Sequence, residues 1–202
     1  MARSPARPAL ALGFMITPAD ATGTPGTGRC ALRLELVKPT HVEGTRAIYN
    51  RAVETTTATF DMTPRSAAEQ LDWIAEHSGA HPAVVALGPD DRVVGFGPDD
   101  WVVGFGSLSP YRPRAAYSTT VENSVYVHED FQRRGVGRAI LMELLRLAEG
   151  YGFHSVIARI AGDNEASVAL HAACGFEMIG VEREVGRKFG RWLDIVCMQH
   201  LI

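Results

Sequence analysis

Cysteine is scarce in this sequence of 202 residues, with three examples at Cys30, Cys174 and Cys197. The count is odd and the spacing fits no metal-ligand motif, so we expect a reducing compartment, the cytoplasm, and no bound metal. Long apolar runs are missing as well, since no stretch approaches the about 18 residues of a membrane-spanning helix. We therefore expect no membrane partner.

An excess of positive charge is also missing, because Lys and Arg number 20 against 23 Asp and Glu, with a formal net charge of −3. This balance argues against a nucleic-acid partner, whose phosphates require a basic surface. The basic residues gather locally instead, at 133–138 and again at 183–191.

The N-terminal residues 1–30 are rich in Pro, Gly, Thr and Ala, which favours a disordered extension ahead of one domain at 31–202. The run "ALALGFMI" follows two arginines and gives a faint outline of a secretion signal. The run is short, however, and the acidic Asp20 lies in the would-be cleavage site. We therefore favour the extension over the signal.

The rest of the chain alternates between strand and helix patterns. Period-two or buried apolar runs predict strands at 32–38, 81–87, 119–129, 154–160, 176–185 and 191–201. Helical periodicity with capping residues predicts helices at 40–56, 63–79, 133–152 and 163–175. This order predicts an α+β domain with a mixed, mainly antiparallel central sheet flanked by helices.

A short tandem duplication interrupts this pattern: "GPDDRVVGF" at 88–96 is followed at once by "GPDDWVVGF" at 97–105. Only the second copy continues into "GSLSPYR" without a break, so we expect it to form the core strand and the first copy to project. Strict alternation places Val102, Gly104 and Gly106 on one face of that strand, and Val103, Phe105 and Ser107 on the other.

The turn at 132–137 reads "QRRGVG" and leads from a strand into a helix. It is neither a Walker A loop, which needs GxxxxGK[ST], nor a GxGxxG fingerprint, because position 140 is Ile. Glycines let backbone N–H groups approach an anion, and the positive end of the helix dipole favours it. The turn therefore suits a diphosphate, although basic glycine turns also serve as plain connectors.

Two longer stretches give the chain a family resemblance. The strand–QxxGxG–helix unit followed by "DNEASVALHAACGFE" resembles the GNAT superfamily of N-acetyltransferases over residues 32–202. Within it, "TVENSVYVHEDFQRRGVG" and "VGRKFGRWLD" are similar to the phosphinothricin and methionine sulfoximine/sulfone acetyltransferase branch.

The resemblance implies a GNAT fold and a homodimer. It also implies transfer of an acetyl group from acetyl-CoA to the α-amine of a small amino-acid analogue, by direct attack in a ternary complex. Two alternatives remain: acetylation of another amine, such as a polyamine or a protein N-terminus, and a non-catalytic acetyl-CoA-binding module.

The expected catalytic residues are Glu122 and His171. Alternation puts Glu122, Ser124 and Tyr126 on one strand face. A carboxylate inside a central strand is unfavourable to bury, so its presence there suggests a function. The resemblance implies that Glu122 is the general base and that His171, where many members have Tyr, protonates the CoA thiolate. The alternatives are a salt-bridged strand glutamate and a histidine satisfied in the core.

The resemblance also implies the contacts of acetyl-CoA, in which Val125 and Val127 pair with the pantetheine and the Val125 N–H polarises the thioester carbonyl. Asn164 otherwise reads as a helix N-cap. The expected acetyl-CoA residues are Val125, Tyr126, Val127, Arg133, Arg134, Gly135, Val136, Gly137, Arg138, Asn164 and Ser167.

The expected acceptor residues are charged and aromatic. Arg112 or Arg114 is a candidate for bidentate binding of a substrate carboxylate. Phe60, Tyr117 and Trp192 are candidates for the walls of an apolar pocket. The alternatives are ordinary loop charges and core aromatics.

Overall fold

The structure, a computed structural model, describes residues 32–88 and 101–202. The extension expected at 1–30 and the projection expected of the first copy, apart from Gly88, lie outside the described residues. The strands are β1 (Arg33–Leu36), β2 (Ala83–Leu87), β3 (Val102–Pro110), β4 (Thr120–Val127), β5 (Ser155–Ala161), β6 (Glu177–Lys188) and β7 (Arg191–Leu201). The α-helices are α1 (Val42–Thr55), α2 (Ala67–Glu76), α3 (Val136–Gly150) and α4 (Glu165–Ala173), with short 3-10 turns at Pro39–His41, Ala115–Tyr117 and Glu129–Phe131.

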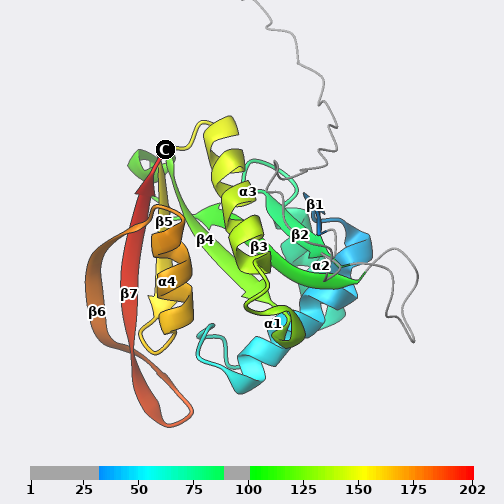
Figure 1. Ribbon diagram of the computed structural model, residues 1–202, viewed down its shortest axis with the longest axis horizontal. Helices are drawn as coiled ribbons and strands as arrows, with labels where there is room; N and C mark the ends of the chain where they lie inside the picture. Colours follow the sequence, from blue (N-terminus) through cyan, green and yellow to red (C-terminus); the bar gives the residue numbers. More distant parts are fainter. Residues whose placement is uncertain (1–31, 89–100) are drawn as a thin grey trace, which may run out of the picture.

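The strands form one 7-stranded sheet in the order β1-β2-β3-β4-β5-β7-β6 (Figure 1). The β4–β5 pair is parallel, and the other pairs are antiparallel. A parallel pair needs a crossover, and α3 supplies it between β4 and β5. The expected α+β architecture is confirmed.

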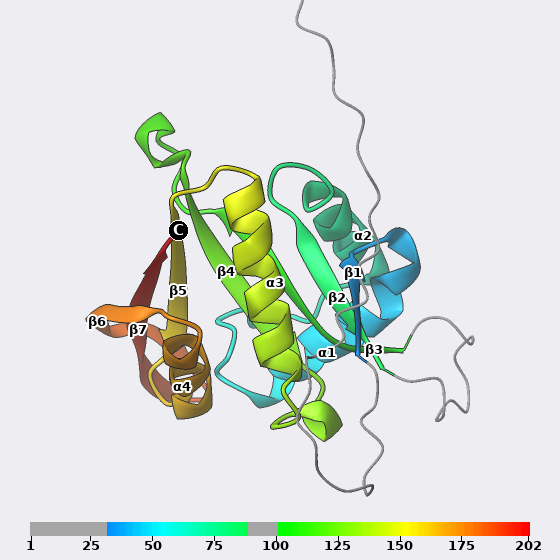
Figure 2. The same cartoon turned by 45° about the horizontal axis from the view of Figure 1, so that its top comes forward.

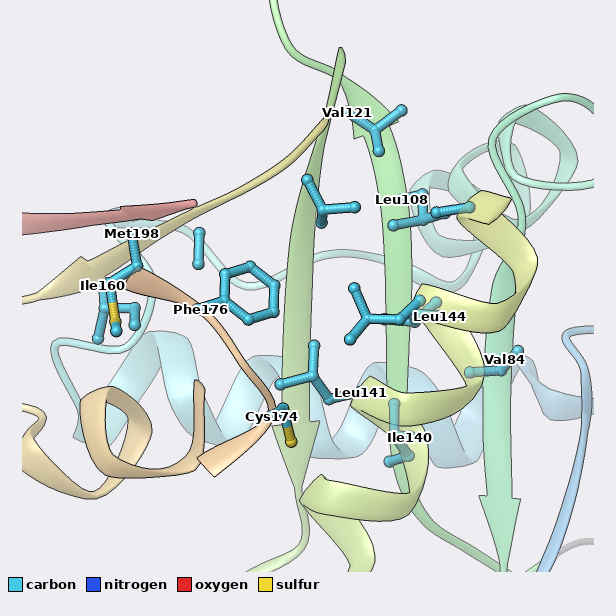
Figure 3. Close-up of a cluster of buried hydrophobic side chains, with 14 of the residues drawn as sticks. Val84, Leu108, Val121, Ile140, Leu141, Leu144, Ile160, Cys174, Phe176 and Met198 are labelled. Atoms are coloured by element: carbon cyan, nitrogen blue, oxygen red, sulfur yellow. The ribbon is translucent and has the colours of Figure 1, made fainter. Parts of the chain in front are cut away.

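Helices cover both faces of the sheet (Figures 1 and 2). The apolar stripe of α3, which includes Ile140, Leu141 and Leu144, packs into a cluster with residues of β2 to β5 and β7 (Figure 3). A second cluster joins α1 and α2 to the opposite face, around Tyr49 and Phe105. Within the described ranges, no helix combines the length and apolarity required to span a membrane.

Helix α2 begins later than its sequence pattern predicted. Ser66 Oγ accepts a hydrogen bond from Glu69 N at 3.2 Å, and the Glu69 carboxylate accepts one from Ser66 N at 2.7 Å. This reciprocal capping box fixes the helix start at Ala67, after Pro64.

The second copy of the duplication provides the start of core strand β3, as predicted, but the expected alternation is wrong for Val102 and Val103. Ala86 pairs with Gly104 while Leu87 pairs with Val102, so Val103 is an extra residue in a β-bulge. Val102 therefore packs with Phe105 in the α1–α2 cluster, and Val103 packs in the α3 cluster. A bulge depends on the partner strand, which the alternation of β3 alone does not reveal.

Candidate active site

A pocket of about 480 Å³ lies at the start of β4, next to the segment that connects β3 to β4. Its volume is in the range of small-molecule sites. Four predicted site residues meet here: Glu122, Arg112, Arg114 and Tyr117. The full lining is Tyr111, Arg112, Pro113, Arg114, Tyr117, Glu122, Arg159 and Glu182.

Strand alternation positions Glu122 as expected. Val121 is buried in the α3 cluster, whereas Tyr126 packs on the other face against Tyr49, with ring centroids 5.3 Å apart. Glu122 is partly buried, and within residues 32–88 and 101–202 its carboxylate has no hydrogen bond or ion pair. Burial raises the pKa of Glu122, and the Glu182 charge adds to the rise, while Arg159 and Arg112 oppose it. A carboxyl with a raised pKa is better suited to accept a proton near neutral pH.

Two charged residues of the pocket were missed by the sequence analysis. Arg159 of β5 donates a hydrogen bond to the Glu182 carboxylate of β6 in an ion pair whose side chains are each 38% exposed. Strand β7 lies between β5 and β6, so the pair reaches across it. Because this contact depends on the strand order, no local pattern in either segment points to it.

Two predicted acceptor residues lie outside the pocket lining. Phe60 packs on Gly186, where an added Cβ would overlap the phenyl ring. Trp192 is 61% exposed, and the Arg187 guanidinium lies 5.5 Å from its ring centroid. The structure does not bring these two aromatics to Glu122, and their acceptor role stays a prediction.

The loop that carries Phe60 is attached to the β6–β7 hairpin by a lysine of the basic segment 183–191, for which the sequence predicted no such contact. Lys188 is 2% exposed, and its Nζ donates to the Thr59 carbonyl oxygen at 2.7 Å. Nearby, the Asp163 carboxylate accepts from Thr57 Oγ1 at 2.6 Å and from Arg191 at 3.1 Å. These contacts fix the α1–α2 loop next to the start of α4.

Strand β4 has an open backbone edge beside the expected acetyl-CoA residues (Figure 2). The parallel ladder with β5 runs from Thr120↔Ser155 to Asn123↔Ala158 and ends there. On its other edge, β4 stays paired with β3 as far as Val127. Between Ser124 and Val127, the β4 edge that faces β5 is therefore available for main-chain hydrogen bonds with a ligand.

The predicted anion turn lies at the start of α3, near the end of this open edge. Gly135 is the N-cap with φ 84°, a left-handed conformation that glycine adopts without strain. An added Cβ at Gly137 would approach Leu170 Cδ2 to 3.1 Å, so its absence lets the helix start close to α4. Arg133, Arg134 and Arg138 are exposed around the first turn, whose N–H groups have no partner within the helix.

On the α3–α4 face, His171 is buried in a hydrogen-bonded cluster. Its Nδ1 lies 2.8 Å from the Ser167 carbonyl oxygen, and its Nε2 lies 3.0 Å from Asn123 Nδ2. A carbonyl can only accept, so Nδ1 carries the proton and Nε2 accepts from the amide. Burial lowers the pKa of His171, so the neutral ring is favoured. The role of His171 as an acid stays a prediction.

Two polar groups complete this cluster. The Asn164 side chain accepts from Ser167 N at 3.1 Å and caps α4, in agreement with the N-cap alternative. Asn123 is 5% exposed, and its Oδ1 is a buried acceptor with no partner within the described part of the chain. A buried acceptor of this kind marks a position where a ligand donor or a water would be stabilised.

A family model described as the Acetyltransferase (GNAT) family matches residues 45–176. The chain belongs to the GNAT family. The match contains both β4 and the α3 turn of this GNAT enzyme, together with α4. The predicted superfamily is confirmed.

Curated relatives of the GNAT enzyme include N-acetyltransferases from two bacteria. Phosphinothricin N-acetyltransferase of Alcaligenes faecalis is 39% identical over 172 residues, covering 85% of this chain and 83% of the relative. L-Methionine sulfoximine/L-methionine sulfone acetyltransferase of Pseudomonas paraeruginosa is 38% identical over 157 residues, covering 77% of this chain and 86% of the relative.

A solved structure agrees with the fold. The phosphinothricin acetyltransferase of Sinorhizobium meliloti, in complex with AcCoA, matches with a TM-score of 0.77 and 35% identity, covering 85% of this GNAT chain and 88% of that one. The resemblance to this branch, inferred from two motifs, thus extends over most of the chain.

Proposed function

We propose that this GNAT enzyme transfers an acetyl group from acetyl-CoA to the α-amine of a small amino-acid analogue of the phosphinothricin, methionine sulfoximine or methionine sulfone type. The observation that carries the proposal is the pocket in which Glu122, with no hydrogen bond or ion pair in the described part of the chain, lies with Arg112 and Arg114. The names of the relatives from Alcaligenes and Pseudomonas support this acceptor class.

The chemistry that Glu122 supplies is proton removal. An ammonium group must lose a proton before its nitrogen can attack, and a Glu122 carboxylate with a raised pKa accepts that proton directly or through a water. Acetyl-CoA supplies an acetyl thioester. The amine nitrogen forms the new C–N bond, the C–S bond breaks, and the sulfur leaves as a thiolate that takes up a proton. His171 stays the predicted donor of that proton, a role in which its Nε2 must first take up a proton, because the one N–H of the neutral ring is donated to Ser167 O.

The residues around α3 and β4 fit acetyl-CoA. The left-handed Gly135, the close packing at Gly137 and the three arginines make a turn suited to a diphosphate. The open edge of β4 offers the backbone of Val125 and Val127 to the pantetheine. The complex of the Sinorhizobium enzyme with AcCoA supports this assignment.

The charge of the acceptor pocket favours an amino acid over a polyamine. Arg112 and Arg114 present positive charge near Glu122, while Glu182 is paired with Arg159. A carboxylate or phosphinate is attracted by the two arginines, and a polycation is repelled. Tyr111 adds an aromatic wall, with its ring centroid 5.0 Å from the Arg112 guanidinium.

A homodimer in the cytoplasm is also proposed. The β6–β7 hairpin exposes Met178, Ile179, Val181 and Val185, each between 48% and 58%, and a second copy would cover apolar surface of this kind. The molar mass in solution, measured by light scattering, tests the dimer: a monomer of 21.9 kDa at micromolar concentration would contradict it.

The enzyme assay measures release of CoA thiol with phosphinothricin, methionine sulfoximine, methionine sulfone, spermidine and an N-terminal peptide as acceptors. We expect turnover with the amino-acid analogues and little with spermidine. Turnover confined to the polyamine or the peptide would contradict the proposed acceptor class. Acetyl-CoA binding without turnover of any acceptor would indicate the binding module instead.

A further inference from the structure

Arg159 lies in the acceptor pocket with two carboxylates and is paired with one of them. The β4–β5 register places Glu122 opposite Ile157, and Arg159 follows two residues later on the same face of β5. The Arg159 guanidinium donates to Glu182, and no hydrogen bond or ion pair to Glu122 is formed. A long arginine side chain in such a pocket would otherwise pair with the nearest free carboxylate.

The other charged and titratable groups around Glu122 come from three parts of the fold. Arg112, Arg114, Tyr111 and Tyr117 belong to the segment that leads from β3 to β4. From β7, burial raises the pKa of the Cys197 thiol; the Glu182 and Glu122 charges add to the rise, and Arg159 opposes it. Directly after α2, His77 reaches Ser109, the β3 partner of Glu122, with its Nε2 at 3.1 Å from the hydroxyl oxygen. None of these groups forms a hydrogen bond to the Glu122 carboxylate within the described residues.

We propose that Glu182 is a positioning residue, which holds the Arg159 guanidinium on the β6 side of the pocket and so keeps the Glu122 carboxylate unpaired and able to accept a proton. This inference rests on the proposed function of Glu122 as the base. It gives a function to the Arg159–Glu182 ion pair, which contributes little to the free energy of folding because it is partly exposed. Glu182 thus acts through Arg159, without contact with the substrate.

The proposal predicts opposite effects for its two members. In Glu182→Gln, Arg159 is released and pairs with Glu122, which lowers the pKa of Glu122. In Arg159→Gln, Glu122 faces the Glu182 charge without the intervening cation, and its pKa rises. In the double variant there is no Arg159 to release, so the loss of Glu182 removes only the repulsion between the two carboxylates and lowers the pKa of Glu122 by a small amount from its value in Arg159→Gln.

The test is a carbon-13 NMR titration of the glutamate side-chain carboxyls in the protein without acetyl-CoA. The Glu122 signal is identified by its loss in Glu122→Gln. We expect its midpoint to move downwards by about 1 pH unit in Glu182→Gln, where Arg159 forms a new ion pair with Glu122, and upwards by about 0.3–0.5 pH unit in Arg159→Gln, where only an interaction without direct contact is lost. The acidic limb of the kcat/KM profile should move in the same directions. Glu143→Gln and Arg146→Gln, which break an ion pair on α3, are matched controls that leave the midpoint unchanged.

The double variant separates positioning from a simple effect of charge. If Glu182 acts by holding Arg159, Glu182→Gln has a much smaller effect in the Arg159→Gln background than in the wild type. An equal effect in both backgrounds, or no movement of the midpoint in either single variant, would overturn the proposal. The titration measures protonation of Glu122 and needs no turnover, so it tests the role of Glu182 separately from catalysis. The assay tests the base itself: an active Glu122→Gln enzyme would refute the proposed function of Glu122.

Discussion

The amide nitrogen of Asn123 lies 3.0 Å from Nε2 of His171 and connects the centre of the sheet to α4. The imidazole also packs edge-on against Phe176, with centroids 5.0 Å apart. Protonation of Nε2 would turn it into a second donor facing the amide N–H group of Asn123. The resulting imidazolium would also be buried away from water, which destabilises its charge. The fold is therefore built around neutral His171.

This relationship predicts a loss of stability in mild acid. The pKa of His171 is lowered in the folded state, so its contribution is present above the unfolded value of about 6.5 and is lost as pH falls below it. His77, whose pKa burial also lowers, acts in the same direction. We expect the fall in Tm between pH 7.5 and 5.5 to be smaller in His171→Gln than in the wild type. The exposed His154→Gln is the control, and an equal fall in all three proteins would contradict the prediction.

Glu122→Gln should lose activity and gain stability. Loss of a general base lowers kcat by roughly 10²–10⁴, with acetyl-CoA affinity retained. The pKa of Glu122 is raised in the folded state, so its stabilising contribution is present below the unfolded pKa of about 4.3 and is lost as pH rises. The neutral variant should therefore have the higher Tm at pH 7.5 and no advantage at pH 4.

The measurements are CoA release across pH 6–9 and thermal denaturation at both pH values. Glu177→Gln, an exposed substitution on β6, should change neither. Unchanged kcat in Glu122→Gln would make Glu122 a structural residue.

The turn before α3 should bind acetyl-CoA through its backbone conformation as well as its charges. Gly135→Ala forces a side chain into a conformation with φ 84°, which costs roughly 1–2 kcal/mol or shifts the turn, and it should weaken acetyl-CoA binding. Gly152→Ala, after the end of the same helix, creates comparable strain at φ 81° with the same open space around the added Cβ. It should leave the affinity unchanged.

Arg133→Ala, in the turn before α3, should also weaken acetyl-CoA binding, whereas Arg146→Ala on α3 itself should not. Titration calorimetry measures all four variants. Wild-type affinity in both Gly135→Ala and Arg133→Ala would refute the assignment of this turn.

Deletion of residues 88–96 should preserve the fold and the activity. The deletion leaves one complete "GPDDWVVGF", in which Gly97 takes the place of Gly88. Gly88 N donates to Trp101 O at 3.0 Å, and a glycine is required there because a Cβ would approach Val103 Cγ1 to 2.7 Å. We expect a Tm equal to or above that of the wild type. Insoluble or inactive protein would show that the first copy belongs to the core.

Local patterns in the sequence predicted the parts of the site that one segment determines. Alternation along β4 placed Glu122 and Asn123 on opposite faces, and the glycines at 135 and 137 marked the start of α3. Each of these features depends on residues within one turn or one strand.

Contacts between distant segments were beyond that reach. The bond from Lys188 to the Thr59 carbonyl joins residues 129 positions apart, and the Arg159–Glu182 pair needs β7 to lie between its strands. The bulge at Val103 is likewise a property of two strands together. Phe60 and Trp192 looked equivalent to Tyr117 as aromatic walls, but the packing of the β6–β7 hairpin takes them elsewhere.

The early end of the β4–β5 ladder has a consequence for hydrogen exchange. Central strands normally hold the slowest amides of a sheet, because they open only with the whole domain. Here the β4 amides beyond Asn123 that point away from β3 lack a neighbouring strand. The middle of the sheet should thus contain a stripe of rapidly exchanging protons. A ligand that forms main-chain hydrogen bonds along β4 would slow the exchange of these amides, because it would take the place of the missing neighbouring strand.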